Sequence, residues 1–231
     1  METHVKIVEL FGLPGCGKTT LVDSLFECGE KNNTNSYSSL HDLLIQYRQL
    51  PFWTKVNVIP IKTWIYVILF IFSVPRVPVK KWRLYSSFFY ISFLYNYAKH
   101  IQEPLYILVD HGLIQSAQSL IYGHANTLSN KSWNLLLKIF QVLNVEFLVY
   151  CRIDSTVSLH RIRKRNRKGN GRLDMITDDN KLLNILNHQK LFFDSAYSIM
   201  SILKDTQTIE IDTNTPVENI AKSLASIIHS V

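Results

Sequence analysis

The sequence predicts an α/β fold with a parallel sheet, and three observations support this prediction. Short apolar runs that suit buried strands alternate with longer segments that suit helices, which is the pattern of βαβ units. A glycine-rich turn separates the first such strand from the first helix. The chain has 231 residues with 47% hydrophobic content, enough for one substantial core. We therefore expect residues 1–231 to form a single domain with insertions.

The N-terminal part of the chain begins with a predicted strand and helix. The run 5–11 is apolar and rich in β-branched residues, and residues 18–26 predict a helix after the glycine turn. Residues 27–39 are polar and rich in Asn and Ser, so they predict a loop with a short strand at its end. A further helix is expected over about 41–50, ahead of Pro51.

Residues 52–100 stand out because they are rich in aromatic residues and carry few charges. Residues 63–75 and 84–98 contain no charged side chain, and the basic, proline-containing segment 76–83 lies between them. This pattern predicts an inserted aromatic helical hairpin. The uncharged run 63–75 is shorter than the about 20 apolar residues that a membrane-spanning helix needs.

The C-terminal part repeats the alternation of strands and helices. Apolar runs at 105–110, 145–150 and 208–211 predict three more strands. The expected helices cover residues 114–124, 131–143, 155–165 and 178–203, and a last helix opens at Pro216, a residue that suits a first helical turn.

The segment from Gly12 to Thr19 matches the phosphate-binding Walker A pattern G-x-x-x-x-G-K-[ST] at every fixed position. Glycines let successive backbone N–H groups turn towards phosphates, and the following helix directs its positive end at the same anion. Lys18 is expected to reach the β- and γ-phosphates of ATP, and Thr19 to offer its hydroxyl to Mg²⁺. The predicted nucleotide-binding residues are Gly12, Pro14, Gly15, Cys16, Gly17, Lys18, Thr19 and Thr20. A chance glycine turn is the alternative, and the position between a strand and a helix argues against it.

Asp110 ends the second apolar strand. In open α/β sheets ligands bind beyond the carboxyl ends of the strands. A carboxylate there can bind Mg²⁺, or it can orient or deprotonate an acceptor hydroxyl; the alternative is an aspartate that caps the next helix. His111 follows directly and is a candidate acceptor-binding residue or proton relay, with an ordinary loop histidine as an equal alternative.

Basic residues concentrate in one stretch. Seven of the 25 Lys and Arg residues lie between Arg161 and Arg172, in a chain of net charge +7. Such a local cluster suits a phosphorylated ligand or an anionic membrane surface, and not a nucleic-acid-binding face. Arg161 and Arg165 share a helix face because they are four residues apart. Arg172 lies in a glycine-containing stretch, and we expect residues 161–175 to form a lid whose arginines neutralise charge on a transferring phosphoryl group. The alternative is a solvated basic face or a membrane contact.

These motifs resemble those of the P-loop nucleoside-monophosphate kinases, and of thymidylate kinases in particular. The glycine loop with Thr19 and Thr20 resembles theirs, the segment 110–112 with Ser116 downstream is similar to their Asp-Arg-Tyr/His element, and the basic stretch up to Asp174 is similar to their lid. The resemblance covers most of the chain, residues 1–26 and 104–231.

The resemblance implies a core of five parallel strands, phosphotransfer from ATP, a requirement for Mg²⁺ and a mobile lid. Lys18 and Thr19 would serve the donor phosphates and the metal, and Asp110 would serve the metal or the acceptor. The lid arginines that the resemblance implies are Arg161, Arg165 and Arg172.

The chain departs from thymidylate kinases where those enzymes recognise their acceptor. Residues 27–50 contain no Arg-Glu-Pro-Gly-like element, His111 stands where those enzymes carry arginine, and residues 52–100 replace their middle section. These differences predict an altered acceptor site. If the aromatic segment forms an acceptor pocket, Arg76 and Arg83 are candidates to bind an acceptor anion.

Residues 52–100 have two further interpretations. They suit a hairpin packed on the domain or at a homodimer interface, and they also suit a peripheral membrane contact. Lys80, Lys81 and Arg83, interleaved with Trp82 and Tyr85, suit anionic headgroups.

The function that best fits these features is an ATP-dependent kinase for a small-molecule acceptor, with ATP and Mg²⁺ as cofactors. The alternatives are a P-loop ATPase or GTPase acting as a switch, and a nucleotide-binding partner of a membrane-associated complex. The chain contains neither the Asn-Lys-x-Asp motif of GTPases nor a Leu-Ser-Gly-Gly-Gln-like signature.

The cysteines and the N-terminus bear on location. Cys16, Cys28 and Cys151 match no zinc motif and form an odd set, which favours a reducing compartment. The N-terminus runs directly into the first predicted strand, with no pattern of a secretory signal. We therefore expect a cytoplasmic protein, located at the inner membrane surface if the hairpin binds lipid.

Overall fold

The computed structural model describes residues 5–31, 37–51, 59–74, 82–101, 105–122, 127–165 and 173–230. Within these ranges the chain forms a sheet of five parallel strands in the order β2-β3-β1-β4-β5. The strands are β1 (Lys6–Gly12), β2 (Tyr37–Ser39), β3 (Tyr106–Val109), β4 (Phe147–Arg152) and β5 (Gln207–Asp212). The sheet confirms the predicted α/β fold, because each strand expected from an apolar run is present and parallel to its neighbours.

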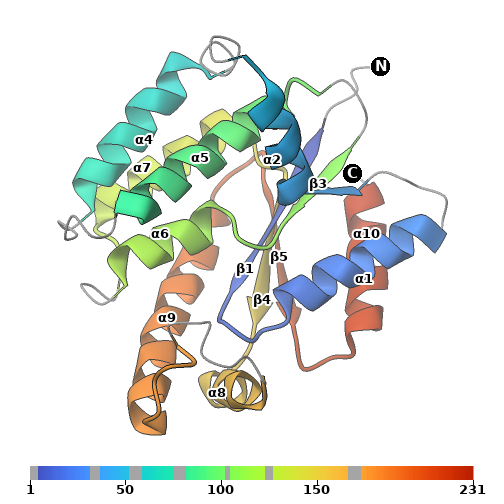
Figure 1. The fold of residues 1–231 in the computed structure, drawn as a ribbon, viewed down its shortest axis with the longest axis vertical. Helices are drawn as coiled ribbons and strands as arrows, with labels where there is room; N and C mark the ends of the chain where they lie inside the picture. Colours follow the sequence, from blue (N-terminus) through green and yellow to red (C-terminus); the bar gives the residue numbers. More distant parts are fainter. Residues whose placement is uncertain are drawn as a thin grey trace.

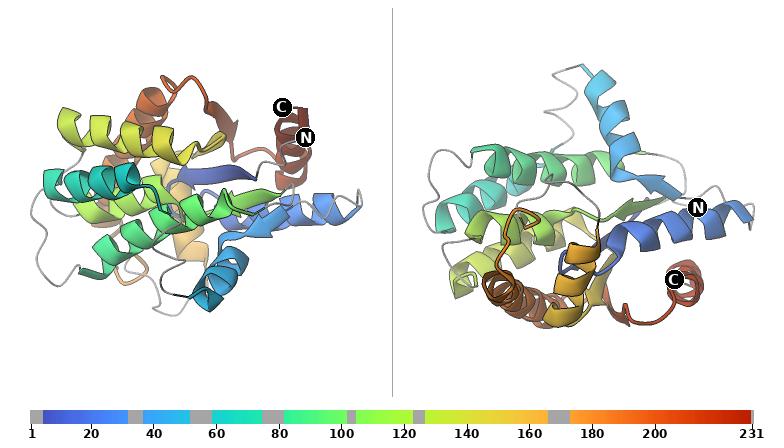
Figure 2. Two further views of the ribbon diagram at one scale, coloured as in Figure 1. Left: turned by 90° about the horizontal axis from the view of Figure 1, so that it is seen from above. Right: turned by 60° about the horizontal axis from the view of Figure 1, so that its bottom comes forward.

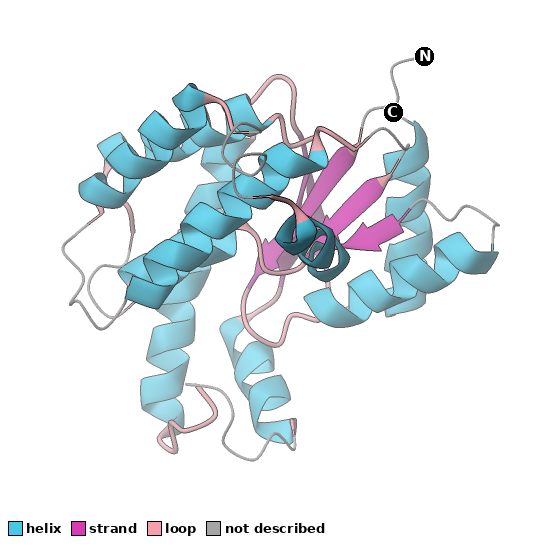
Figure 3. Ribbon diagram, turned by 45° about the horizontal axis from the view of Figure 1, so that its top comes forward, coloured by secondary structure: helices cyan, strands magenta, loops and turns pink. Residues whose placement is uncertain are grey.

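Helices cover both faces of the sheet (Figure 1). On one face lie α1 (Lys18–Lys31) and α10 (Val217–Ser230), and on the other lie α6 (Leu113–Ile121), α7 (Asn130–Leu143) and α9 (Asp179–Met200). Figure 3 shows the strands enclosed between these two layers. Because both faces are covered, β1 and β4 are apolar along nearly their whole length and almost fully buried.

Strand β1 lies at the centre of the sheet, and this places the glycine loop. Glu9 of β1 pairs in register with Val109 of β3 on one side and with Leu148 of β4 on the other. Strands β3 and β4 pair with β1 on opposite sides, so a topological switch point lies at the C-terminal end of β1. The glycine loop, the turn after β3 and helix α8 (Ser155–Lys164), which follows β4, meet at this end of the sheet (Figures 1 and 2).

The predicted aromatic hairpin is present as α4 (Ile61–Ser73) and α5 (Trp82–Ala98). The rings of Trp64 and Phe93 have centroids 4.5 Å apart, and those of Phe70 and Phe88 are stacked at 4.7 Å. A higher residue number in α4 thus pairs with a lower residue number in α5, so the two helices are antiparallel. Helix α4 packs on α7, and α5 packs on α6 and on α2 (Leu40–Gln49).

One face of α4 remains exposed in the isolated chain. Phe72 is 84% exposed and Ile61 is 71% exposed, with Ile65 and Leu69 between them on the same face. No helix within the described ranges combines the length and the apolar character that a membrane span requires. Contact of residues 52–100 with a membrane surface or with a second copy of the chain stays a prediction.

The first helix differs from its predicted length. The sequence predicted a helix over 18–26 and a polar loop from residue 27, whereas α1 continues to Lys31. Cys28 packs against the core, and this buried contact favours helix even though Gly29 follows it.

Candidate functional site

The glycine loop joins β1 to α1, and its backbone needs glycine at defined points. Gly12 has φ +146°, and a Cβ there would collide with the carbonyl oxygen of Cys151. Gly15 and Gly17 also have positive φ, at +85° and +93°. The loop therefore has the tight curl that turns backbone N–H groups inwards.

Lys18 is held by the loop that precedes it. Its Nζ donates to the carbonyl oxygens of Gly12 at 2.9 Å and Leu13 at 3.2 Å, and it lies 3.3 Å from Sγ of Cys16. The ammonium group is therefore positioned at the mouth of the loop, where it can exchange these acceptors for phosphate oxygens.

Cys16 is a buried member of the loop that contacts a second buried thiol. The thiol of Cys151, at the end of β4, donates a hydrogen bond to Cys16, and Lys18 is a nearby cation. These two interactions outweigh burial and lower the pKa of Cys16 to about 6. Cys16 therefore offers Lys18 a third acceptor in the loop, at 3.3 Å from Nζ.

Thr19 and Asp110 meet directly. The hydroxyl of Thr19, in the first turn of α1, donates to Oδ2 of Asp110 at 3.0 Å, although the two residues are 91 positions apart. A hydroxyl and a carboxylate beside a phosphate-binding loop are the oxygen ligands that Mg²⁺ takes together with substrate phosphates and water. These two residues would therefore suit a Mg²⁺ ion, and their role as metal ligands stays a prediction.

His111 follows Asp110 and is exposed beside the candidate site. Desolvation lowers the pKa of its imidazole; Asp110 opposes this shift and Lys18 adds to it. The net direction favours the neutral imidazole.

A buried carboxylate below the Asp110 turn was missed by the sequence analysis. Glu9 of β1 is fully buried; its Oε1 accepts from the backbone N–H of Ile114 at 2.7 Å, and its Oε2 accepts from the hydroxyl of Tyr95 on α5 at 2.8 Å. It thereby caps α6, whose N-cap residue Gly112 offers no side-chain acceptor. A Cβ on Gly112 would collide with the Glu9 carboxylate. The signal in the sequence was a single acid within an otherwise apolar strand.

Glu9 is expected to make stability depend on pH. Burial raises the pKa of Glu9 from its ordinary 4.5 to about 7, and the hydrogen bonds from Ile114 and Tyr95 only partly oppose this shift. Because its pKa is raised in the folded state, the native protein binds the Glu9 proton more tightly than the unfolded chain does. The contribution of Glu9 to the free energy of unfolding is therefore complete below pH 4.5 and is lost as the pH rises through 7. Glu9→Gln removes this titration. The free energy of unfolding of the variant relative to wild type should rise by about 3 kcal/mol between pH 4.5 and 8, measured by urea unfolding.

The opposite result would contradict this prediction. A difference between wild type and Glu9→Gln that stays constant with pH would show that Glu9 has an unshifted pKa. The exposed acid Asp205, at the turn before β5, supplies the control variant Asp205→Asn, for which no such slope is expected.

Two of the predicted lid arginines lie at the glycine loop. Arg161 and Arg165, both at the C-terminal end of α8, line a cavity of ≈460 Å³ together with Gly15 and Gly17. Nη2 of Arg161 donates to the carbonyl oxygen of Thr213 at 3.0 Å, in the turn between β5 and α10 that forms the opposite wall. The predicted shared face of these arginines is confirmed, and it faces the loop.

The other predicted basic residues lie elsewhere. Arg163 points away from the loop and forms an ion pair with Asp179 at 2.7 Å. Arg83 is exposed on the first turn of α5. Arg76 and Arg172 lie outside the described residues, so their predicted roles in acceptor binding and in the lid stay predictions.

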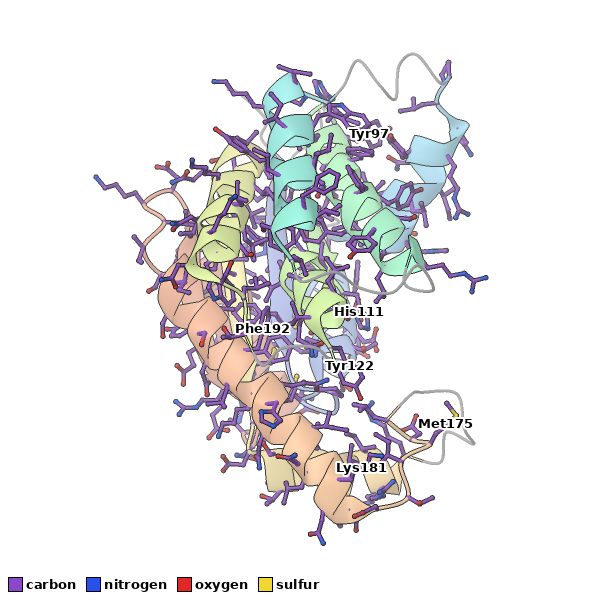
Figure 4. The ribbon with its side chains drawn as sticks, turned by 90° about the vertical axis from the view of Figure 1, so that its left-hand side faces the viewer. Tyr97, His111, Tyr122, Met175, Lys181 and Phe192 are labelled. Atoms are coloured by element: carbon purple, nitrogen blue, oxygen red, sulfur yellow. The ribbon has the colours of Figure 1, made fainter. Side chains whose placement is uncertain are left out.

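A second cavity, of ≈260 Å³, lies on the other side of the glycine loop. Its walls are Pro14 of the loop, Leu84 of α5, Leu173 ahead of α9, and polar residues of α6 and α9. Figure 4 shows this side of the molecule, with Tyr122 at the end of α6 and α9 alongside. The glycine loop therefore contributes to two cavities: Gly15 and Gly17 line the one with arginines, and Pro14 lines the one without charged side chains among its described lining residues.

The parallel sheet and the glycine loop together define a P-loop α/β protein. Two solved structures have a similar backbone fold. Deoxyadenosine kinase from M. mycoides, solved with bound dATP, has 13% sequence identity and a TM-score of 0.48, over 96% of this chain and 99% of that chain. Shikimate kinase from Acinetobacter baumannii, in complex with shikimate, has 15% identity and a TM-score of 0.48, over 99% of this chain and 95% of that chain. No protein-family model matches the sequence, and no curated protein does.

Proposed function

We propose that the chain is an ATP-dependent phosphotransferase that transfers the γ-phosphoryl group of ATP to a small acceptor. The observation that carries this proposal is the Thr19–Asp110 contact of 3.0 Å beside a glycine loop whose residues line two separate cavities. A switch protein needs a single nucleotide site, whereas a transferase needs a donor site and an acceptor site that meet at the phosphoryl group.

The arginine-lined cavity suits the donor nucleotide. The backbone N–H groups of residues 15–17 and the N-terminus of α1 would hold the phosphates. Lys18 would leave its carbonyl acceptors and neutralise charge on the β- and γ-phosphates. Arg161 and Arg165 would neutralise the charge that builds up as the phosphoryl group is transferred, and Arg172 of the predicted lid is proposed as a further arginine with this role.

On the acceptor side, Asp110 would orient the acceptor hydroxyl and accept its proton, and His111 would contact the acceptor as a neutral hydrogen-bonding group. When bound by Thr19 and Asp110, Mg²⁺ would supply positive charge to the donor phosphates. The acceptor site differs from that of thymidylate kinases in residues 27–50 and 52–100, so we propose a thymidylate-kinase-like reaction with a different acceptor.

A second candidate function is a nucleotide-binding partner of a membrane-associated complex. The exposed apolar face of α4, with Phe72 84% exposed, favours this alternative, because such a face suits a second copy of the chain, another protein or a membrane surface. The alternative and the kinase differ in whether ATP turnover depends on an acceptor.

The experiment that tests the proposed function measures ADP release from ATP–Mg²⁺ across a panel of acceptors. The panel holds nucleosides, nucleoside monophosphates, sugars and lipid alcohols, each assayed with and without liposomes. A kinase gives turnover that one acceptor class stimulates. ATP binding without stimulation by any acceptor would favour the binding-partner function instead.

A further inference from the structure

Helix α4 carries most of the exposed large apolar side chains in the described part of the chain. Nine such side chains are exposed there, and five of them lie on this one helix, whereas the other four lie on separate elements. Single exposed apolar residues are ordinary, but a contiguous apolar patch marks an interaction site. The five residues form what we call the outer face of α4: Ile61, Ile65, Ile68, Leu69 and Phe72.

The outer face runs along one side of the helix. Four of its residues, beginning at Ile61 and ending at Phe72, follow one another at spacings of four, three and four, which places them on one side of an α-helix. The opposite side, with Val67 and Phe70, is buried against the protein. A helix that is apolar all round is ordinarily covered on every side. Because α4 lies at the outside of the molecule, away from the sheet (Figure 1), something beyond the described part of the chain covers its outer face.

The charges around the outer face restrict what covers it. Helices α4, α5 and α7, which pack together, contain lysines and an arginine but no Asp or Glu. Lys62 is exposed next to Ile61, and Nζ of Lys138 on α7 lies 5.7 Å from the ring centroid of Tyr66 on α4. The outer face is therefore an apolar stripe with cations at its edges and no anion on the helices around it. This arrangement is complementary to a lipid surface that has apolar chains beneath anionic headgroups.

The side chains at the edge of the outer face suit the boundary between lipid and water. Trp64 and Tyr66 of α4 are half-buried, and tryptophan and tyrosine favour the headgroup level of a bilayer. A lysine can cover apolar surface with its stem while its ammonium group stays among the headgroups.

A second copy of the chain fits the outer face less well. In a two-fold symmetric dimer each copy would present the same lysines to its partner, and these helices contain no acid to offset the repulsion. A stable protein–protein interface uses about 20–30 residues on each side, whereas the outer face offers five apolar side chains on a 13-residue helix. A lipid surface needs no matching residues, because headgroups and acyl chains adjust to the protein.

We propose that the outer face of α4 binds the surface of an anionic lipid bilayer, with Ile61 and Phe72 entering the acyl boundary and Lys62 and Lys138 at the level of the headgroups. The 13 residues of α4 are fewer than the about 20 that a membrane span needs, so the helix lies in the plane of the surface. Binding of this kind is peripheral and reversible. It uses no residue of the glycine loop and therefore does not depend on the proposed kinase function.

The first measurement is flotation of the full-length wild type with lipid vesicles. One set of vesicles contains phosphatidylcholine alone, and the other is an equal mixture of phosphatidylcholine and phosphatidylglycerol. The protein should partition at least about tenfold more strongly to the mixed vesicles, and high salt should weaken this binding because it screens the lysines. Absence of binding to the mixed vesicles, or equal binding to both kinds, would overturn the proposal.

The second measurement tests the apolar part of the outer face. The double variant Ile61→Ser/Phe72→Ser replaces side chains that are 71% and 84% exposed and should weaken partition to the mixed vesicles about tenfold or more. The matched control Leu191→Ser/Ile202→Ser replaces side chains that are 59% and 71% exposed elsewhere and should bind as wild type does. Both variants should keep the melting temperature of wild type. An equal loss of binding in the two variants would contradict a specific role of α4.

The third measurement tests the cations. Lys62→Gln/Lys138→Gln should weaken binding to the mixed vesicles about tenfold or more and leave the weak binding to phosphatidylcholine unchanged. Lys181→Gln/Lys222→Gln removes the same charge at exposed positions on α9 and α10 and should leave both unchanged. If the two double variants lose binding equally, the net charge of the protein and not the outer face attracts the lipid, and the proposal fails.

Sedimentation velocity without lipid decides between a lipid surface and a second copy of the chain. Wild type should be a monomer at micromolar concentration. A dimer that Ile61→Ser/Phe72→Ser dissociates would assign the outer face to a second copy and overturn the proposal. None of these measurements needs ATP or an acceptor, so their failure leaves the proposed phosphotransfer standing. Conversely, vesicle binding without phosphotransfer would retain the lipid-binding face and remove the kinase function.

Discussion

Replacement of Lys18 by alanine is expected to lower kcat by roughly 10²- to 10³-fold, the loss that follows removal of one preorganised group that stabilises transition-state charge. Its ammonium group lies 2.9 Å from Gly12 O and 3.2 Å from Leu13 O, whereas Arg161 contacts the loop at Gly15 O, at 3.4 Å. Lys18 and Arg161 therefore hold different parts of the loop, and we expect Arg161 not to replace the lost ammonium group. The measurement is acceptor-dependent ADP release by wild type and variant at saturating ATP–Mg²⁺.

The fold should survive this substitution. The Lys18 side chain is only partly buried and its hydrogen bonds go to carbonyl groups within one turn of chain, so their loss costs about 1 kcal/mol of stability. Lys131→Ala, at an exposed position on α7, is the control for a lost lysine elsewhere. Acceptor-dependent turnover that is unchanged in Lys18→Ala would remove the glycine loop from the catalytic mechanism.

The sequence alone was sufficient to predict the sheet and the glycine loop, because both depend on local patterns. Apolar runs such as 105–110 mark buried strands wherever they lie, and the Walker A spacing itself dictates the curl of the loop. The contact between Thr19 and Asp110 was also predictable, since parallel strands bring their carboxyl ends to one edge of the sheet.

The residues that the sequence could not assign depend on contacts between distant segments. Glu9 and Tyr95 are 86 positions apart, and their hydrogen bond exists only because the aromatic hairpin packs beside α6. Gln115 and Gln189 belong to different helices, so their common cavity follows from helix packing and leaves no local pattern. The same limit applies to the arginines: Arg163 lies between Arg161 and Arg165 in sequence, yet its partner Asp179 directs it away from the loop.

The Tyr95–Glu9 contact also explains how the inserted hairpin affects the geometry of the candidate site. Glu9 accepts hydrogen bonds from Tyr95 of α5 and from Ile114 of α6, and α6 follows the turn that carries Asp110. The position of Asp110 therefore depends on the buried carboxylate and, through it, on the hairpin. The aromatic segment thus contributes to the geometry of the site whether or not its outer face binds another molecule.

Replacement of Asp110 by asparagine is expected to lower kcat by roughly 10²-fold or more and to raise the Mg²⁺ concentration that gives half-maximal turnover. Asparagine keeps the size of the side chain and one acceptor for the Thr19 hydroxyl, so the 3.0 Å contact and the local structure should persist. What the variant loses is the negative charge, which both binds the metal and accepts the acceptor proton.

Titration of turnover with MgCl₂ and with pH separates these two roles of Asp110. A loss that high Mg²⁺ restores assigns the carboxylate to the metal, whereas a loss that persists at saturating Mg²⁺ assigns it to the acceptor hydroxyl. Asp205→Asn removes the same charge at an exposed turn ahead of β5 and should leave both kcat and the Mg²⁺ dependence unchanged. Equal kcat and equal Mg²⁺ dependence in wild type and Asp110→Asn would reduce Asp110 to a hydrogen-bond acceptor for Thr19, because that is the one interaction that the substitution preserves.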